Sequence, residues 1–293
     1  MRSGKMNISL HAAASTIRSA TTKVDSISNN IANLNTVGYK AQRVSFQDLL
    51  YENMNQTERV NLEGRITPLG YQYGHGVRVN GLTQDMSLGN LLQTNDQHHV
   101  ALSGPGMFQL LVTHAEADSL GVSQEAMAAY DHEDYGFVFT RDGNFRIDVR
   151  EGYSSLVDPR GYQVSDRYGN PIEFTNDVES FRIDEQGSLY INDETTPFTQ
   201  LMLVGFNNPQ SLHHAGNNIY VERQFIDGNY QDVNNNPALL QQTKFMQGYV
   251  ENSNVDIVRE MSELITAQRM LQFGARAIQS TDTLMGLANS IRS

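Results

Sequence analysis

The two ends of this chain carry the same three-and-four spacing of apolar and small residues, although more than 200 residues separate them. Such spacing holds one side of a helix toward a partner helix, so the sequence predicts a long helix at each end. The N-terminal seam runs through Leu10, Ala13, Ile17, Ala20, Val24, Ile27, Ile31 and Leu34. The C-terminal seam runs through Ile257, Met261, Leu264, Gln268, Leu271, Ala275, Ile278, Asp282 and Met285. Neither stripe can be buried by its own helix, so each requires the other end of the chain or another molecule.

Composition excludes several classes of protein. The chain has no cysteine, which excludes disulfides, thiolate metal sites and cysteine catalysis. No apolar run approaches the length of about 20 residues that spans a bilayer, so we expect no membrane insertion. The first residues lack a continuous apolar segment, so we expect export, where it occurs, to proceed without a cleaved signal peptide.

The net charge of −12 is distributed unevenly along the chain. Residues 1–60 contain seven basic and four acidic side chains, whereas residues 61–249 contain ten and twenty-four. A nucleic-acid-binding protein normally presents a basic surface, so the acidic middle argues against nucleic acid as a partner. A solvated acidic surface that keeps the protein soluble is the simpler interpretation.

The pattern of residues predicts an α+β fold in which long, coiled-coil-like terminal helices enclose a mainly β central domain. Short apolar stretches separated by Gly, Pro and Asn turns predict a sandwich or a partly closed barrel. Asp142-Gly143 predicts a hairpin between residues 137–140 and 145–147, and similar turns are expected at 159–161 and 185–187. The sequence predicts five parts. The first is an N-terminal axial helix at 1–40, with its last turn before Gly38, and a linker or extended arm follows at 41–76. A β-rich body at 77–226 contains an acidic insertion at 114–134, and it is followed by a linker and helix start at 227–254 and by a C-terminal axial helix at 255–293.

The residues give little support to catalysis or to a cofactor. His98-His99 and His213-His214 lack an accompanying HExxH pattern, and adjacent strand residues point to opposite faces, so we expect no metal site. The carboxylate clusters at 131–134 and 184–185 are more typical of solvated loops than of a hydrolase, whose paired acids must face each other across a cleft. We therefore expect that the chain is not an enzyme and binds no cofactor.

Three stretches of the chain resemble the flagellar rod and hook basal-body family of axial proteins. The first is NNIANLNTVGYK at 29–40. The second comprises VALSGPGMF at 100–108, FTRDGNF at 139–145 and LVD at 156–158, which are closer to the rod type, as in the distal rod, than to the hook or filament type. The third is QGYVENSNVD at 247–256, continuing through Glu260-Met261 to Ala267-Gln268-Arg269. The order and spacing of all three fit that family.

The resemblance implies a structural subunit that polymerises into a hollow shaft for motility. In that family the terminal segments form the inner helical layer and the β domain lies outside. The implied partners are copies of the same chain, other axial rod and hook proteins, and the flagellar type III export apparatus, and the implied location is the basal body in the cell envelope. The residues before Met6, the insertion at 114–134 and His98-His99 depart from the family pattern, which leaves the position within the rod open.

Amide side chains gather at the end of the N-terminal seam. Buried between helices, these asparagines would specify register, whereas exposed asparagines would mark a fraying helix end, and the resemblance favours register. The candidate N-terminal assembly residues are Leu10, Ile17, Val24, Ile27, Asn29, Asn30, Ile31, Asn33, Leu34, Asn35, Gly38 and Tyr39. The candidate C-terminal assembly residues are Ile257, Met261, Leu264, Gln268, Leu271, Ala275, Ile278 and Met285.

Two alternatives to a polymer subunit remain open from the residues. A secreted adhesin or interaction protein with a helical stalk and a β head would bind a partner without polymerising. A hydrolase or sugar-binding module on the β domain, acting on peptidoglycan, is the other alternative. A polymer subunit requires a heterologous interface, because an isologous interface closes into a dimer.

Overall fold

The computed structural model describes residues 2–49, 51–54, 71–74, 76–122, 135–150, 152–174, 178, 180–192, 195–224, 226, 228–234 and 236–292. The chain forms two compact units. The first, which we call the terminal unit, comprises Met1–Ala32, Gln42–Gln84 and Asp256–Ser293. The second, which we call the body, comprises Asn33–Ala41 and Asp85–Val255.

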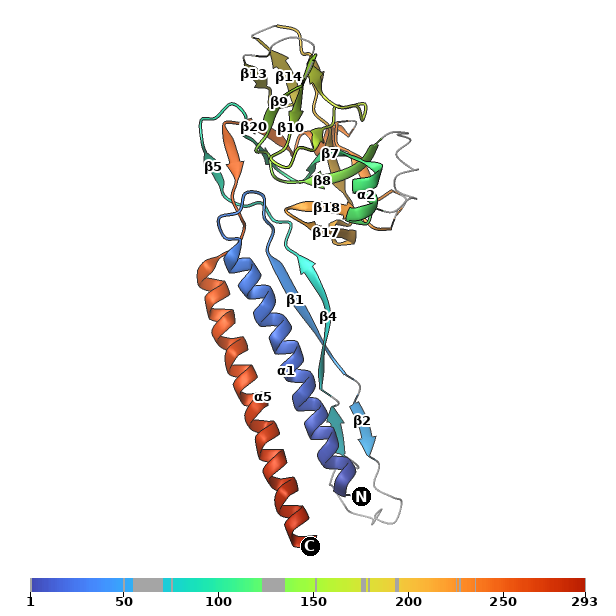
Figure 1. Ribbon diagram of the computed structural model, residues 1–293, viewed down its shortest axis with the longest axis vertical. Coiled ribbons are helices and arrows are strands. Elements are labelled where there is room, and N and C mark those ends of the chain that lie inside the picture. Colours follow the sequence, from blue (N-terminus) through green and yellow to red (C-terminus); the bar gives the residue numbers. More distant parts are fainter. Residues whose placement is uncertain are drawn as a thin grey trace. The chain divides into compact units, whose positions relative to one another are not determined.

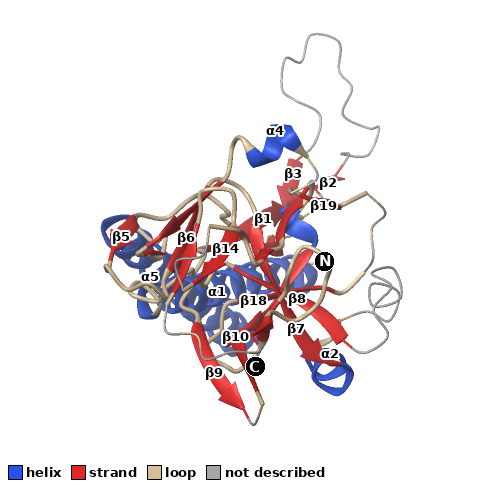
Figure 2. Ribbon diagram, turned by 90° about the horizontal axis from the view of Figure 1, so that it is seen from above, coloured by secondary structure: helices blue, strands red, loops and turns tan. Residues whose placement is uncertain are grey.

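The terminal unit contains two long helices and an antiparallel pair of strands. Helices α1 (Arg2–Ala32) and α5 (Ile257–Arg292) lie side by side and run in opposite directions (Figures 1 and 2). Strand β1 (Gln42–Asp48) pairs antiparallel with β4 (Val77–Gln84), and β2 (Tyr51–Met54) pairs with β3 (Tyr71–Gly74). A helix at each end is therefore confirmed, and the two stripes belong to the same unit.

The ends of the two helices follow local hydrogen-bonding chemistry. Asp256 caps α5, because its carboxylate accepts hydrogen bonds from the backbone N–H of Val258 at 2.9 Å and of Arg259 at 3.3 Å. Helix α1 ends at Ala32, and the N–H of Thr36 closes a turn on the carbonyl of Asn33 at 3.2 Å. The expectation that this helix continues to Gly38 was wrong, because the asparagine-rich turn ends it first.

The body is mainly β. Its helices are α2 (His114–Leu120), the 3-10 turn η2 (Pro209–Ser211) and α4 (Pro237–Leu240). Its strands are β5 (Leu91–Gln93), β6 (Val100–Ser103), β7 (Met107–Thr113), β8 (Tyr135–Thr140), β9 (Arg146–Arg150), β10 (Tyr153–Val157), β11 (Gln163–Val164), β12 (Glu173–Phe174), β13 (Phe181–Ile183), β14 (Ser188–Ile191), β15 (Thr199–Gln200), β16 (Leu203–Phe206), β17 (Leu212–Gly216), β18 (Ile219–Glu222), β19 (Tyr230–Asp232), β20 (Lys244–Gln247) and β21 (Tyr249–Glu251).

The strands form open sheets, so the α+β class is confirmed but no barrel closes among the described strands. The largest sheet has ten strands and includes the path β12-β10-β11-β7-β8-β18-β17. Strand β7 is buried on both faces, with Phe108 and Leu110 in one apolar cluster and Met107 and Leu111 in another. Because successive strand residues point to opposite sides, this one strand joins both halves of the core.

The hairpin predicted at Asp142-Gly143 was wrong. Strand β8 pairs with β7 and β18, whereas β9 pairs with β10. The carbonyl of Gly143 instead accepts a hydrogen bond from the N–H of Val100 at 2.9 Å, and a Cβ at position 143 would lie 1.7 Å from the carbonyl oxygen of Val100. The glycine thus permits a close approach to β6. The turns at 159–161 and 185–187 do join antiparallel partners, β10 with β11 and β13 with β14.

Both segments predicted as linkers contain paired strands. Within 41–76, β1 pairs with β4, which groups β4 with the terminal unit instead of the body. Within 227–254, β20 pairs with β6 and β21 pairs with β5, so this segment is part of the body. Of the predicted insertion at 114–134, residues 114–120 form α2, where the Glu116 carboxylate accepts the N–H of Thr113, and residues 123–134 lie outside the described residues.

Replacing Gly143 with Ala should lower the free energy of unfolding of the body by at least about 2 kcal/mol, because a Cβ there overlaps backbone that cannot move freely. Urea denaturation of the full chain measures the change. Gly81→Ala is the control, because Gly81 has no atom within 4 Å of an added Cβ. Equal effects of the two substitutions would contradict the close approach.

Candidate functional site: the two ends of the chain

The N-terminal seam faces α5. Ala20 and Ile27 are buried, whereas Leu10, Ala13, Ile17, Val24 and Ile31 are half-buried. The two helices approach closely where Ile17 meets Gly274, because a Cβ on Gly274 would lie 2.7 Å from Cγ1 of Ile17. The predicted stripe on α1 therefore packs against the other end of the same chain. Leu34 lies beyond the helix and packs in the body with Tyr39, Ala41 and Val255.

Only half of the predicted C-terminal seam lies in this contact. The half-buried positions are Leu264, Leu271, Ile278 and Met285. The exposed positions are Ile257, Met261, Gln268, Ala275 and Asp282. Glu260, Ala267 and Gly274 are buried in their place, seven residues apart and one position earlier. The small residues at 267 and 274 allow the two helices to pack closely. Their seven-residue spacing could have identified this face, but a pattern based on large apolar residues does not include them.

A second face of α1 binds the strand pair of the terminal unit. Ser19 donates a hydrogen bond to the carbonyl of Val77 at 3.2 Å, and Ser26 donates to the carbonyl of Gln42 at 3.2 Å. Both serines are buried. Their hydroxyls satisfy backbone carbonyls that an apolar side chain would leave unpaired. The seven-residue spacing of these serines is the sequence feature that indicates this face.

Asn30 joins α1, β1 and α5. Its amide accepts the N–H of Gln42 at 2.9 Å and donates to the carbonyl of the same residue at 2.9 Å. It also donates to Oε2 of Glu260 at 3.2 Å. Asn30 is 1% exposed, whereas Asn29 and Asn35 are exposed and Asn33 is half-buried. Of the four asparagines, only Asn30 is buried as a register-specifying residue would be, and a role in assembly stays a prediction.

Burial raises the pKa of the Glu260 carboxyl above its ordinary value of 4.5, while the hydrogen bond from Asn30 acts in the opposite direction. The carboxylate lies in the first turn of α5, where the helix N-terminus favours negative charge. Glu260 therefore holds the first turn of α5 against α1 through its hydrogen bond with Asn30, although burial makes its negative charge less favourable.

In the body, the segment 33–41 is bound to the segment 247–255. Gly38 has φ +70°, and its N–H donates to the carbonyl of Glu251 at 2.7 Å. A Cβ at position 38 would lie 2.8 Å from the backbone nitrogen of Asp142, so both the backbone angle and the space require glycine. Asn254 accepts the N–H of Ala41 at 2.8 Å. These contacts bring together the two stretches 29–40 and 247–256 that carry the family resemblance, at Gly38 and at residues 251–254.

The carboxylate of Glu251 lies between two buried cations. Lys40 donates to Oε1 at 2.6 Å, and Nη1 of Arg141 lies 3.6 Å from Oε2. The N–H of Gly89 donates to Oε1 at 2.8 Å, and Lys40 also donates to the carbonyl of Ser87 at 2.7 Å. Burial, followed by the charge of Arg141, lowers the pKa of Lys40, and Glu251 opposes this shift. This ion cluster joins four segments that are distant in the sequence.

Other sequence candidates show no catalytic arrangement among the described residues. Asp96 accepts a hydrogen bond from the N–H of His98 and lies 2.9 Å from its ring, and the His99 ring lies 2.7 Å from the hydroxyl of Thr94. His213 and His214 are successive residues of β17. Within the described ranges, His, Asp and Glu side chains form no group of three that could bind a metal ion, and no helix has the length and apolarity to cross a membrane. The cluster at 131–134 lies outside the described residues.

Comparisons with known proteins match both ends and nearly the whole length of the chain. The family model described as flagella basal body rod protein matches residues 10–40, and the model for the C-terminal region of flagellar basal-body rod FlgEFG proteins matches residues 246–291. The flagellar basal-body rod protein FlgG of Borreliella burgdorferi is 30% identical over 97% of this chain and 98% of its own length. FlgG of Buchnera aphidicola subsp. Schizaphis graminum is 32% identical over 88% and 90%, and the flagellar hook-basal body complex protein FlhP of Bacillus subtilis is 30% identical over 97% and 99%.

Replacing Glu251 with Gln should destabilise the body by about 3–5 kcal/mol, because it leaves Lys40 and Arg141 buried without the opposing charge. The measurement is denaturation monitored by circular dichroism. Glu185→Gln removes an exposed ion pair with Lys244, 2.6 Å long, and should cost less than about 1 kcal/mol. Similar losses in both variants would mean that the Glu251 cluster contributes no more than a surface pair.

Replacing Glu260 with Gln should make the terminal unit more stable at pH 7, by less than about 1 kcal/mol. The pKa of Glu260 is higher in the folded chain than its ordinary value, so its contribution to stability is fully present below pH 4.5 and is lost as the pH rises through the raised pKa. Hydrogen exchange of α1 and α5 between about pH 4 and 7 measures the pH dependence, which the variant should lack. Glu263→Gln, which removes an ion pair with Lys23, is the control and should not stabilise. A wild-type chain that gains stability over this pH range relative to Glu260→Gln would contradict the assignment.

Proposed function

This chain belongs to the flagellar basal-body rod protein family, and on that premise we propose that it polymerises through its paired terminal helices into the hollow axial shaft of the rod. The chain is a structural rod subunit of the basal body, not an enzyme. The alternatives of an adhesin and of a peptidoglycan hydrolase are set aside, because rod proteins match nearly the entire length.

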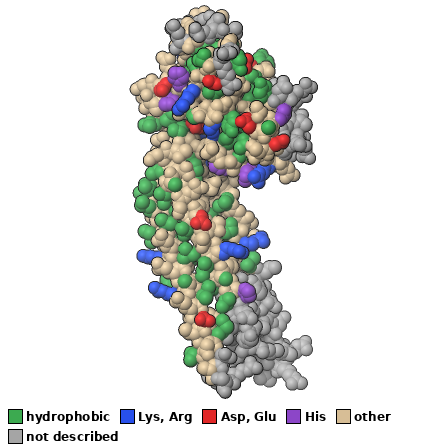
Figure 3. Space-filling model, viewed as in Figure 1, with side chains coloured by type: hydrophobic (Ala, Val, Ile, Leu, Met, Phe, Trp, Pro, Cys, Tyr) green, Lys and Arg blue, Asp and Glu red, His purple; other side chains and the backbone are tan. Residues whose placement is uncertain are grey.

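The observation that carries the proposal is the apolar surface of α5 that α1 does not cover. Two thirds or more of the side chains of Val258 and Phe273 are exposed, at 71% and 67%. Figure 3 shows hydrophobic side chains along the face of α5 that is in view. The other exposed large apolar residues of this helix are Ile257, Met261, Ile265, Met270, Leu284 and Leu287. An apolar surface this extended is typical of an interface with another molecule.

These exposed residues occupy more than one side of α5. Val258, Met261 and Ile265 follow a spacing of three and four, and Phe273, Leu284 and Leu287 lie on a different side of the helix. Contacts on two sides permit a neighbour on each, which a growing polymer requires and a closed dimer does not. The exposed Ile257 and Met261 of the predicted seam then serve contacts between copies, while Leu264, Leu271, Ile278 and Met285 serve the pair within one chain.

Family membership also supports the partners and the location. A rod protein assembles with other basal-body components, and the finer proposal is that this chain contacts copies of itself and neighbouring axial rod and hook proteins. We further propose that the flagellar type III apparatus exports it without a cleaved signal peptide. The match to a rod protein over 97% of this chain is what supports these proposals.

Replacing both Phe273 and Leu287 with Ser should raise the concentration needed for assembly at least about tenfold, because each removed contact buries one large apolar side chain and 1.4 kcal/mol corresponds to a factor of ten. Sedimentation velocity over a concentration series measures this. The control replaces the exposed Gln272 and Gln279 with Ser. A full chain that stays monomeric even when added to purified basal bodies would overturn the proposal.

A further inference from the structure

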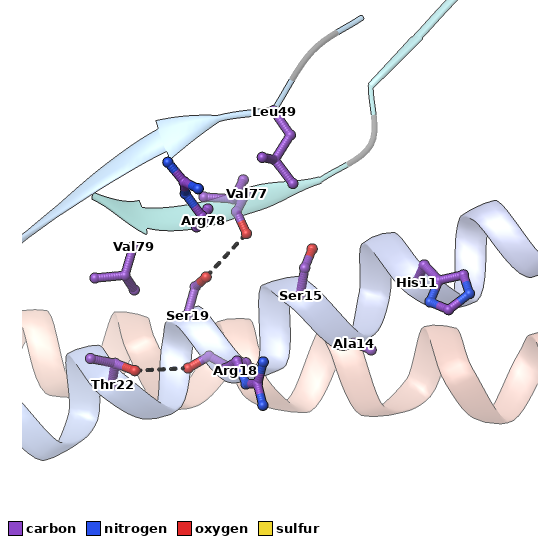
Figure 4. Close-up of a pocket in the computed structure, with 10 residues that line it drawn as sticks. All are labelled: His11, Ala14, Ser15, Arg18, Ser19, Thr22, Leu49, Val77, Arg78 and Val79. Atoms are coloured by element: carbon purple, nitrogen blue, oxygen red, sulfur yellow. Dashed lines mark hydrogen bonds between the residues drawn. The ribbon is translucent and has the colours of Figure 1, made fainter. Parts of the chain in front are cut away.

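A basic groove of about 670 Å³ lies between α1 and β4 in the terminal unit (Figure 4). Arg18 and His11 come from α1, and Arg78 comes from β4, so groups able to carry positive charge stand on both walls. Leu49 and Val79 line the strand side. The groove therefore combines a charged rim with an apolar wall.

The floor of the groove consists of hydroxyl groups that already have partners. Ser15 donates to the carbonyl of Ala12 at 2.8 Å, and Ser19 donates to the carbonyl of Val77. By contrast, the guanidinium groups of Arg18 and Arg78 form no hydrogen bond or ion pair with the residues that the structure describes. The available recognition chemistry of the groove is therefore cationic, and it fits carboxylates.

Charge is divided between the two units of the chain. The terminal unit contains twelve basic and nine acidic residues, whereas the body contains nine basic and twenty-four acidic residues. Two bodies repel each other, and a body attracts the basic groove of another copy. Charge complementarity thus identifies a second copy of this chain as the occupant.

We infer that the groove formed by His11, Arg18 and Arg78 receives acidic side chains from the body of a second copy. The two contacting surfaces are different, so the contact is heterologous and repeats from copy to copy without closing. This inference rests on the proposed polymerisation and adds to it an electrostatic contact distinct from the apolar faces of α5. Such contacts mainly set the rate and the register of association.

The first experiment reverses the charge of the groove. Replacing Arg18 and Arg78 with Glu in the full chain should raise the concentration needed for assembly about tenfold. It should also flatten the dependence of assembly on salt between about 0.05 and 0.5 M, where screening changes most. Arg146→Glu with Arg182→Glu, both exposed in the body and outside the groove and α5, alters the net charge equally and is the control.

The outcomes separate this inference from the proposed function. A wild-type chain that polymerises while both double variants assemble equally well overturns the inference and leaves the function intact. A wild-type chain that does not polymerise overturns both. A weaker assembly of the groove variant alone supports the inference.

A second experiment identifies the occupant directly. A photoreactive side chain in place of Ala14, which lines the groove, is introduced into isotopically labelled chains that are mixed with unlabelled ones before assembly. Cross-links between copies that map to residues 85–255 support the inference. Cross-links that map to α5 of a second copy overturn it, because the occupant is then an apolar helix.

Discussion

The buried side chain and backbone of Glu251 bind the segments that flank the terminal helices to the rest of the body. Its two oxygens face Lys40, Arg141 and the N–H of Gly89, and its backbone carbonyl accepts the N–H of Gly38. These partners come from three separate parts of the sequence, around residues 38–40, 89 and 141. Oε1 accepts hydrogen bonds from Lys40 and from the N–H of Gly89, whereas Oε2 accepts none from the described residues and faces only the charge of Arg141 at 3.6 Å. The segments that lead to and from the terminal helices are thereby fixed in the body.

Helix α1 of the terminal unit has three sides with different surroundings. One side of α1 packs against α5, a second binds the strand pair through Ser19, Ser26 and Asn30, and a third is exposed at Asp25 and Ser28. Small residues make this possible, since Ala20 and Gly274 let the helices approach and serines bind strand carbonyls. The large apolar residues of α5 are consequently left on the outside, where another molecule can cover them.

The sequence predicted some features of the fold and of the site correctly and failed on others for identifiable reasons. The N-terminal seam and the α+β class were accessible, because they depend on periodicity and on residue type. The sequence did not distinguish Asn30 from the neighbouring asparagines, because their burial depends on where β1 and α5 lie. The prediction of a hairpin at Asp142-Gly143 was wrong because an Asp-Gly dipeptide can also lie where another strand approaches the backbone closely. Only the position of Val100 in the folded chain distinguishes this close approach from a hairpin turn. The predicted C-terminal seam differs by one residue from the observed contact at alternate positions. Ala267 and Gly274 are buried there because their small side chains allow close packing of the helices, and they were not recognised because they contribute little apolar area.

By itself, the sequence determined that both ends are helical, that each has a stripe requiring a partner, and that the middle is an acidic β domain. These properties depend on local spacing and on composition, which need no knowledge of distant contacts. The tertiary structure alone decided which stripe faces the other end of the chain and which large side chains remain exposed. It also decided that Lys40, Arg141 and Glu251 meet, because a contact such as that of Lys40 with Glu251, 211 residues apart in sequence, depends on the path of the whole chain.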